Sequence, residues 1–181
     1  HAHATASLRE VRGFDEAGLF WHPVSHFGNS TSSAEEAAEV VGIVRAALGG
    51  SLFVIRDRPQ TMTQQDLIVV AAYNAQVECL TQTLAEAGFD EVRVGTVDKF
   101  QGQEAAVAIV SLAASSGDDV PRGLDFLLMR NRLNVAISRA QWSAHLVSSD
   151  RLGDSLPHTA EGVAALSGYL RLTERGHRWG D

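Results

Sequence analysis

The sequence has one cysteine, one lysine and no apolar run long enough to cross a membrane. The single Cys79 cannot form a disulfide within the chain, which is typical of a reducing compartment. No uncharged apolar run approaches the roughly 18 residues of a membrane-spanning helix. The N-terminus shows no signal-peptide core. We therefore expect a cytoplasmic protein with no membrane partner.

Lysine is also scarce, because only one of the 15 lysine and arginine residues, Lys99, is a lysine. It is followed by Phe100, whereas the phosphate loop GxxxxGK[ST] needs Ser or Thr after its lysine. The chain therefore contains no such loop. The net charge of −7 excludes a generally basic protein that coats nucleic acid, so any nucleic-acid binding must be local.

Two stretches of strand length are strongly apolar: Leu67–Ala72 throughout, and Ala106–Leu112 with Ser111 as its one polar residue. Such runs are typical of strands that are buried on both faces of a parallel sheet. Further strands are predicted at Leu19–Val24, Val92–Val94 and Ala144–Ser148, and Ser51–Ile55 fits a strand or a collapsed loop. The polar stretch Arg56–Gln65 predicts a surface loop.

Helical patterns alternate with these strands. Ser33 to Glu36 have the form of a capping box, which predicts a helix that ends at Gly49. Glu35, Glu36 and Glu39 fall in its first turns, where the helix dipole favours negative charge. We prefer this interpretation of the three carboxylates to a metal site.

Three more helices are expected. Asn74 is a good N-cap for a helix that Gly88 closes. Leu124–Ala140 is predicted to be helical for most of its length, and Thr159–Leu172 is amphipathic. Helices that alternate with buried strands predict a three-layer α/β/α fold with a mostly parallel central sheet.

The chain is long enough for one domain with its own core. We place this domain at residues 19–173, after a poorly ordered segment at 1–18 and before a tail at 174–181. In open sheets of this class, ligands bind the loops at the carboxyl ends of the strands. Three loops carry functional residue types: Tyr73–Gln76, Thr96–Glu104 and Asn131–Arg139.

The loop Thr96–Glu104 combines capping, flexible and acidic residues. Thr96 and Asp98 can cap a short helical turn, and Gly102 allows a close approach of the backbone. The Glu104 carboxylate can accept hydrogen bonds from ribose hydroxyls. An ordinary capped turn before a strand explains the same residues equally well.

Two arginines in the third loop, Arg132 and Arg139, lie seven residues apart, so a helix would place them on one face. Arginine matches phosphate oxygens, and an arginine at a γ-phosphate stabilises the transition state of phosphoryl transfer. The alternative is a pair of surface arginines in salt bridges.

Three motifs together are recognisable: Val70-Ala-Ala-Tyr-Asn-Ala-Gln76, Gly95-Thr-Val-Asp-Lys-Phe-Gln-Gly-Gln-Glu104 and Arg132-Leu-Asn-Val-Ala-Ile-Ser-Arg-Ala140. With them the chain resembles, from Leu19 to Leu152, the second RecA-like domain of a superfamily 1 helicase. The group is the one that includes the decay-factor and replication-nuclease helicases (AAA_12). The opening Trp21-His-Pro-Val looks most like bacterial members joined to a RecB-like nuclease.

The resemblance implies roles for individual residues. Arg139 matches the arginine that reaches the γ-phosphate of ATP, and Gly102 with Glu104 matches the pair near the ribose and γ-phosphate. Gln101 and Arg132 are expected to support that nucleotide site. The positions expected to contact nucleic acid are Thr96, Asp98, Tyr73, Asn74 and Gln76.

The resemblance also implies partners outside this chain. Mg²⁺ and most of ATP would be held by a first RecA-like domain with Walker A and B motifs, so this chain alone is not expected to hydrolyse ATP. Single-stranded nucleic acid, DNA rather than RNA, would bind across both domains. Two family features are missing: no arginine stands in the first motif, and Gln141 replaces a basic residue.

Two alternatives come from other classes. The chain fits a RecA-like binding or regulatory module without motor activity. A self-contained nuclease would need carboxylates that converge on a metal, and Asp118-Asp119 and Glu35-Glu36 fit a loop and a helix start better.

Overall fold

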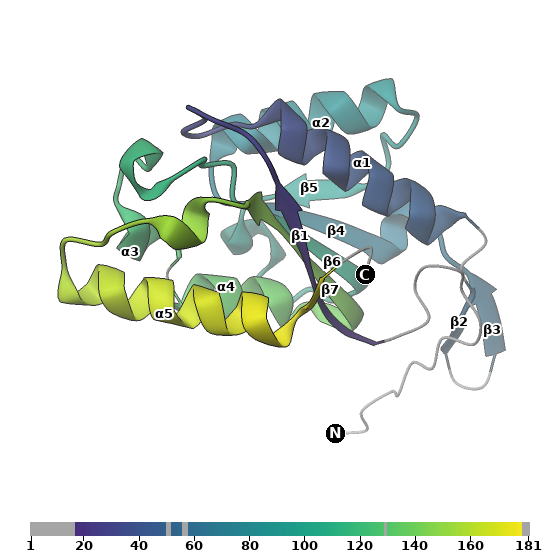
Figure 1. The fold of residues 1–181 in the computed structure, drawn as a ribbon. Helices are drawn as coiled ribbons and strands as arrows, with labels where there is room; N and C mark the ends of the chain where they lie inside the picture. Colours follow the sequence, from purple (N-terminus) through teal and green to yellow (C-terminus); the bar gives the residue numbers. More distant parts are fainter. Residues whose placement is uncertain (1–16, 50–51, 56–57, 129, 179–181) are drawn as a thin grey trace.

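The structure, a computed structural model, describes residues 17–49, 52–55, 58–128 and 130–178. Within these residues the chain forms three layers around a six-stranded sheet whose neighbouring strands are all parallel. Figure 1 shows this sheet between two layers of helices. The predicted fold class is confirmed.

The strand order of the sheet is β5-β4-β6-β7-β1-β8. Its strands are β1 (Gly18–Val24), β4 (Leu67–Ala71), β5 (Arg93–Gly95), β6 (Ala105–Ser111), β7 (Ala140–Ser149) and β8 (His177–Arg178). All but β8 overlap strands that the sequence predicted, so those five predictions are confirmed.

The continuous apolar run of β4 is explained by burial on both faces. Leu67 and Val69 pack into the core on one side of the sheet, and Ile68 and Val70 pack into the core on the other. All four are at most 1% exposed. Successive side chains of a strand point to opposite faces, so a strand between two helical layers needs apolar residues at every position.

Helices α1 (Ala34–Leu48) and α2 (Asn74–Glu86) cover one face of the sheet, and α3 (Leu124–Leu127), α4 (Arg130–Ile137) and α5 (Ala160–Arg175) cover the other (Figure 1). The predictions of α1, α2 and α5 are confirmed. No helix among the described residues has the length and apolar character that a membrane span requires.

Leu124–Ala140 is helical for most of its length, as predicted, but in two helices, α3 and α4, and Ala140 already begins β7. Two predictions of local structure are wrong. Within the expected loop Arg56–Gln65, β3 (Arg58–Thr61) pairs antiparallel with β2 (Leu52–Ile55) outside the main sheet. The residues expected to form a tail include the end of α5 and the strand β8, which pairs with β1. Residues 1–16 of the expected N-terminal segment lie outside the described residues.

Because the strands are parallel, all their carboxyl ends lie along one side of the sheet, here called the carboxyl edge. All their amino ends lie along the opposite side, the amino edge. At the carboxyl edge, where strands end, Tyr73 follows β4 and Thr96 follows β5. At the amino edge, where strands begin, Glu104 directly precedes β6 and Arg139 directly precedes β7. The prediction that all three loops lie at the carboxyl ends of the strands is therefore wrong for Glu104 and Arg139, which lie at the opposite edge.

Candidate nucleotide and nucleic-acid interface

At the amino edge, Glu104 and Arg139 lie on adjacent segments. The backbone N–H of Ala105 donates to the carbonyl of Arg139 at 3.0 Å. The Gln141 amide donates to the Glu104 carboxylate at 3.0 Å. Gln101, Gly102 and Glu104 are exposed and Arg139 is half-buried, so these groups are accessible to a ligand.

Gly102 occupies a backbone conformation that favours glycine. Its φ is +78°, in the left-handed region, and a Cβ there would meet nothing within 4 Å. The requirement for glycine therefore comes from the backbone and not from crowding. The open space beside it leaves room for a ligand at the turn before Glu104.

The Arg139 side chain folds back onto the end of α4. Its Nε donates to the carbonyl of Val135 at 3.1 Å and its Nη2 donates to Ser138 Oγ at 3.2 Å. A cation at this position interacts favourably with the dipole of the helix C-terminus. The prediction that Arg132 and Arg139 share a helical face is wrong, because α4 ends at Ile137. The side chain of Arg132 lies outside the described residues.

A second arginine, Arg93, braces the loop that carries Glu104, and sequence reasoning missed it. Its two terminal nitrogens donate to Gln103 Oε1 at 3.2 Å and to the Gln65 carbonyl at 2.8 Å. Gln103 in turn donates to the Lys99 carbonyl at 3.0 Å. Arg93 is the first residue of β5. Its position at the start of a strand is the one sequence feature that could have indicated that it lies at the amino edge.

The single lysine has a structural part in the same loop. Lys99 Nζ donates to the carbonyl of Val94 at 2.7 Å. The side chain crosses Gly95 so closely that a Cβ there would lie 2.3 Å from Lys99 Cδ. The glycine that opens the second motif is therefore required by the packing of Lys99.

At the carboxyl edge, Thr96, Val97 and Phe126 line a small pocket whose described lining contains no charged residue. The Tyr73 ring lies 6.1 Å from the Phe126 ring, and burial raises the pKa of the Tyr73 hydroxyl. Thr96 is the N-cap residue of the 3₁₀ helix η2 (Val97–Phe100), but its side chain makes no capping bond. Thr96 is half-buried and Asp98 is exposed.

The start of α2 differs from its prediction. Tyr73, and not Asn74, is the N-cap residue, and it makes no capping bond through its side chain. Asn74 is the first helical residue and is exposed at the carboxyl edge. Asn74 therefore remains accessible to a strand, although its predicted capping part is wrong.

Gln76 is fully buried and its amide is occupied. Its Oε1 accepts from the Ser33 N–H at 2.7 Å, and its Nε2 donates to the Ser33 carbonyl at 3.2 Å and to Ser111 Oγ at 2.9 Å. These bonds join the N-termini of α1 and α2 to the end of β6. A direct contact between Gln76 and nucleic acid does not fit this arrangement, so we do not retain Gln76 in the binding set.

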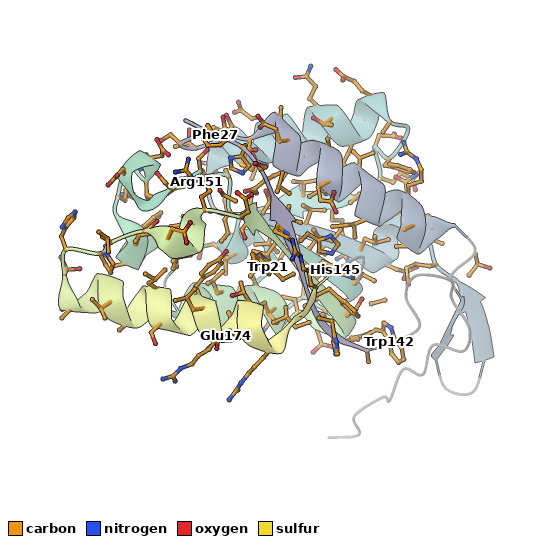
Figure 2. The ribbon with its side chains drawn as sticks, viewed as in Figure 1. Trp21, Phe27, Trp142, His145, Arg151 and Glu174 are labelled. Atoms are coloured by element: carbon orange, nitrogen blue, oxygen red, sulfur yellow. The ribbon has the colours of Figure 1, made fainter. Side chains whose placement is uncertain are left out.

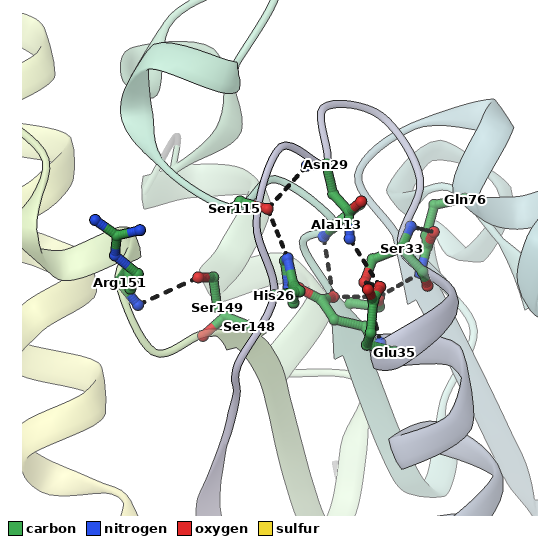
Figure 3. A network of polar contacts seen from close by, with 12 residues as sticks. His26, Asn29, Ser33, Glu35, Gln76, Ala113, Ser115, Ser148, Ser149 and Arg151 are labelled. Carbon is green, nitrogen blue, oxygen red and sulfur yellow. Dashed lines mark hydrogen bonds and ion pairs between the residues drawn. The ribbon is translucent and has the colours of Figure 1, made fainter.

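Glu36 lies in the first turn of α1, as predicted, but its side chain points into the protein. The carboxylate is fully buried and accepts from Ser111 Oγ at 2.6 Å and from the Ala113 N–H at 2.9 Å. Its other oxygen lies 3.1 Å from His26 Nε2. Figure 3 shows this network where the loops from β1 and β6 meet α1. Only half of the predicted capping box forms, with Ser33 Oγ accepting from the Glu36 N–H.

The charge of Glu36 controls the ionisation of His26. Burial lowers the pKa of His26, but the hydrogen bond to Glu36 and the charges of Glu36, Glu35 and Asp150 together raise it above its usual value. Ser115 Oγ contacts the other ring nitrogen of His26 at 2.7 Å and accepts from the Asn29 N–H at 2.9 Å. The β1–α1 loop is therefore held to the β6 loop by buried polar contacts.

A second chain of polar contacts joins α1 to the neighbouring strands β1 and β7. Glu39 Oε1 lies 2.8 Å from His22 Nδ1, His22 Nε2 lies 2.9 Å from His145 Nδ1, and His145 Nε2 lies 3.1 Å from Ser143 Oγ. Burial, together with the neighbouring His22, lowers the pKa of His145 well below its usual value. His145 lies inside a predicted strand, and nothing in the sequence pattern marks it as part of a chain.

The described residues contain no group of three or more His, Cys, Asp and Glu side chains that could hold a metal ion. Asp118 and Asp119 belong to the 3₁₀ helix η3 (Gly117–Asp119), where Asp119 accepts from Ser116 Oγ at 2.7 Å. The two residues thus have local structural contacts.

Comparisons with known proteins give a family match and several relatives named as helicases. Residues 21–151 match the model of the AAA domain family AAA_12. The chain is 49% identical over 75 residues to the DNA polymerase alpha-associated DNA helicase A of Schizosaccharomyces pombe, a match that covers 41% of this chain and 11% of that protein.

Two further relatives match over different lengths. The human 3'-5' exoribonuclease HELZ2 is 32% identical over 134 residues, 68% of this chain and 4% of that protein. The Gallus gallus DNA replication ATP-dependent helicase/nuclease DNA2 is 36% identical over 77 residues, 42% of this chain and 8% of that protein. The chain thus spans only a small part of these relatives. It belongs to the AAA_12 family and forms a domain of the superfamily 1 helicase type.

Proposed function

We propose that this chain is the second RecA-like motor domain of an ATP-dependent superfamily 1 helicase. In this proposal the amino edge closes on ATP that is bound mainly by a first RecA-like domain, and the carboxyl edge contacts a single nucleic-acid strand. The helicase-type family supports ATP and strand binding in general. The assignment of the chain to the second motor domain rests on its motifs and geometry.

The observation that carries the proposal is the adjacency of Arg139 and Glu104 at the amino edge. A guanidinium matches phosphate oxygens, and a carboxylate accepts from ribose hydroxyls. Gln101 and Gly102 lie exposed in the preceding turn, where they can adjoin the same nucleotide. Arg132 belongs to the proposed set through its motif alone.

The step assigned to this chain is electrostatic. On closure, Arg139 leaves the Val135 carbonyl and Ser138 and points its guanidinium at the γ-phosphate of ATP. There it stabilises the negative charge that grows in the transition state of phosphoryl transfer. Mg²⁺, held by the other domain, would neutralise charge between the β- and γ-phosphates.

The carboxyl edge has the complementary task. Thr96, Asp98, Tyr73 and Asn74 lie at the ends of β4 and β5 and can contact phosphates and bases of one strand. The chain is acidic overall, so strand binding depends on this local surface and on the partner domain. DNA is the strand we favour.

The experiment that tests the proposal is Arg139→Ala in the intact protein. We expect the turnover number for ATP at saturating single strand to fall roughly 1,000-fold, the lower end for an arginine that acts on a γ-phosphate. Arg151→Ala, which removes an exposed arginine at the carboxyl edge, is the matched control. Unchanged turnover in Arg139→Ala would contradict the assignment.

One observation favours a second candidate, a RecA-like binding module without motor activity. The Arg139 guanidinium already has two hydrogen-bond partners at the end of α4, as expected for a purely structural cap. A structural cap predicts that Arg139→Ala lowers stability but leaves strand-dependent turnover per folded molecule unchanged. The same experiment therefore separates the two candidates.

A further inference from the structure

The carboxyl edge carries two exposed arginines that each lie over a phenylalanine ring. Arg122 Cζ lies 4.6 Å from the centroid of Phe126, and Arg151 Cζ lies 4.9 Å from the centroid of Phe27. Figure 2 shows Phe27 and Arg151 at this end of the sheet, far from Trp142. Neither pair belongs to the sequence motifs that suggested the function.

The two pairs differ in their surroundings. Phe126 lines the pocket that Thr96 and Val97 also line, and none of its described lining residues is charged. Phe27 and Arg151 line a pocket that also contains three carboxylates, from Asp118, Asp119 and Asp154. A phosphate group would be repelled by that second pocket and tolerated beside the first.

The first pair also has an aromatic neighbour with an unused polar atom. The Tyr73 ring lies 6.1 Å from the Phe126 ring at a tilt of 36°. Within the described residues, its hydroxyl is buried and has no hydrogen-bond partner. Arg122 and Tyr73 thus both lie beside the Phe126 ring, and of the three residues Phe126 lines the pocket.

We propose that Arg122, Phe126 and Tyr73 form a stacking site for one nucleobase of the single strand, with Arg122 contacting the adjacent phosphate. Every base has a face that stacks on an aromatic ring, so such a site binds without reading sequence. An arginine over the ring adds a cation for the backbone. This inference rests on the proposed function and specifies where the strand lies.

The test measures binding of a fluorescent oligothymidylate to the intact protein by anisotropy over a range of salt concentrations. We expect Phe126→Ala to weaken binding about ten-fold, which is ~1.4 kcal/mol, and Phe126→Trp to restore it. On a backbone of equal length without bases, Phe126→Ala and the parent should bind alike.

Arg122→Gln provides an independent reading, because this side chain is exposed and its loss does not disturb the core. The variant should make the dependence of log K on log salt shallower by about one unit, as expected when one phosphate contact is lost. The matched controls are Phe27→Ala and Arg151→Gln, which should bind like the parent. A melting curve for each variant shows whether it is folded. If Phe126→Ala does not fold, the salt dependence of Arg122→Gln tests the site.

Two results would overturn the site. In one, Phe126→Ala and Arg122→Gln bind the strand as tightly as the parent does. If the parent also hydrolyses ATP in the presence of the strand, only the stacking site is contradicted, and the proposed function is not. In the other, Phe27→Ala and Arg151→Gln weaken binding as much as the Phe126 and Arg122 variants do. A parent that neither binds the strand nor hydrolyses ATP in its presence would contradict the proposed function and this site together.

Discussion

The amino and carboxyl edges of the sheet are built differently. At the amino edge the proposed nucleotide residues are accessible and make few side-chain contacts: Glu104 accepts from Gln141, and Arg139 donates to two groups at the end of α4. At the carboxyl edge the loops are joined by hydrogen bonds of fully buried side chains, mainly Glu36 and Gln76. The difference suggests a platform at the carboxyl edge and movable groups at the amino edge.

This division suits a motor domain. A group that reaches across a cleft must exchange its resting contacts for a ligand at little cost, and exposed hydrogen bonds allow that exchange. A surface that grips a strand repeatedly must keep its shape, and buried polar networks rigidify the segments they join. The predictions below test this comparison from the largest expected effect to the smallest.

The largest effect is expected for Glu36→Ala, which removes the centre of the carboxyl-edge network. His26, Ser111 and the Ala113 N–H would lose their buried partner, and breaking a buried pair costs about 3–5 kcal/mol. Urea unfolding of the chain measures the loss. The neighbouring Glu35→Ala is the control, because Glu35 is exposed. Equal losses in the two variants would refute a special structural part for Glu36.

Gly95→Ala and Gly102→Ala compare crowding with backbone strain. At Gly95 the new Cβ meets the Lys99 side chain, and overpacking costs about 1–3 kcal/mol. At Gly102 the methyl group has space, and the left-handed backbone costs about 1–2 kcal/mol. Thermal melting should show that Lys99→Ala rescues Gly95→Ala and not Gly102→Ala. Rescue of both, or of neither, would contradict the distinction.

Two buried histidines should give the chain opposite pH dependences. The pKa of His145 is lowered by folding, so its contribution is present above the unfolded pKa of about 6.5 and is lost as the pH falls below it. The pKa of His26 is raised, so its contribution is present below about 6.5 and is lost as the pH rises through the folded pKa.

Unfolding free energies of the parent, His145→Asn and His26→Asn, measured between about pH 5 and pH 8, check these signs. The first variant should flatten the acid side of the profile and the second the alkaline side. If His145→Asn instead flattened the alkaline side and His26→Asn the acid side, the directions of the two pKa shifts would be wrong.

The smallest effect on stability is expected for Arg139→Ala. The half-buried side chain interacts with the C-terminus of α4, an interaction typically worth about 0.3–1 kcal/mol. A melting curve of the variant therefore serves as the control for its turnover. A loss of several kcal/mol would show that Arg139 is mainly structural and would favour the binding module.

The sequence predicted what depends on local pattern. Apolar runs located β4 and β6, because burial on both faces favours apolar residues at nearly every position; Ser111 at the end of β6 is the exception. Ser33 and Gly88 marked helix ends through capping chemistry that acts within a few residues, and Ser33 does accept from the Glu36 N–H. The three motifs pointed to the family that residues 21–151 match.

The sequence could not show what depends on contacts between distant segments. In the sequence Glu36 cannot be distinguished from its exposed neighbour Glu35. Its structural role comes from the buried hydrogen bonds that Ser111 and Ala113 donate to it. Arg139 looked helical because α4 ends without a glycine or proline. The division of the motifs between two edges follows from the parallel sheet, which puts the start of one strand and the end of another at opposite sides.

The central claim is that nucleotide chemistry lies at the amino edge and strand binding at the carboxyl edge. The most direct test measures two quantities for Arg139→Ala and Phe126→Ala in the intact protein: ATP turnover at saturating strand, and the dissociation constant of the strand. We predict a crossed pattern, in which Arg139→Ala loses turnover and keeps its affinity for the strand, while Phe126→Ala loses affinity and keeps most of its turnover. Variants that each lose both quantities in equal proportion would contradict the division of the two edges.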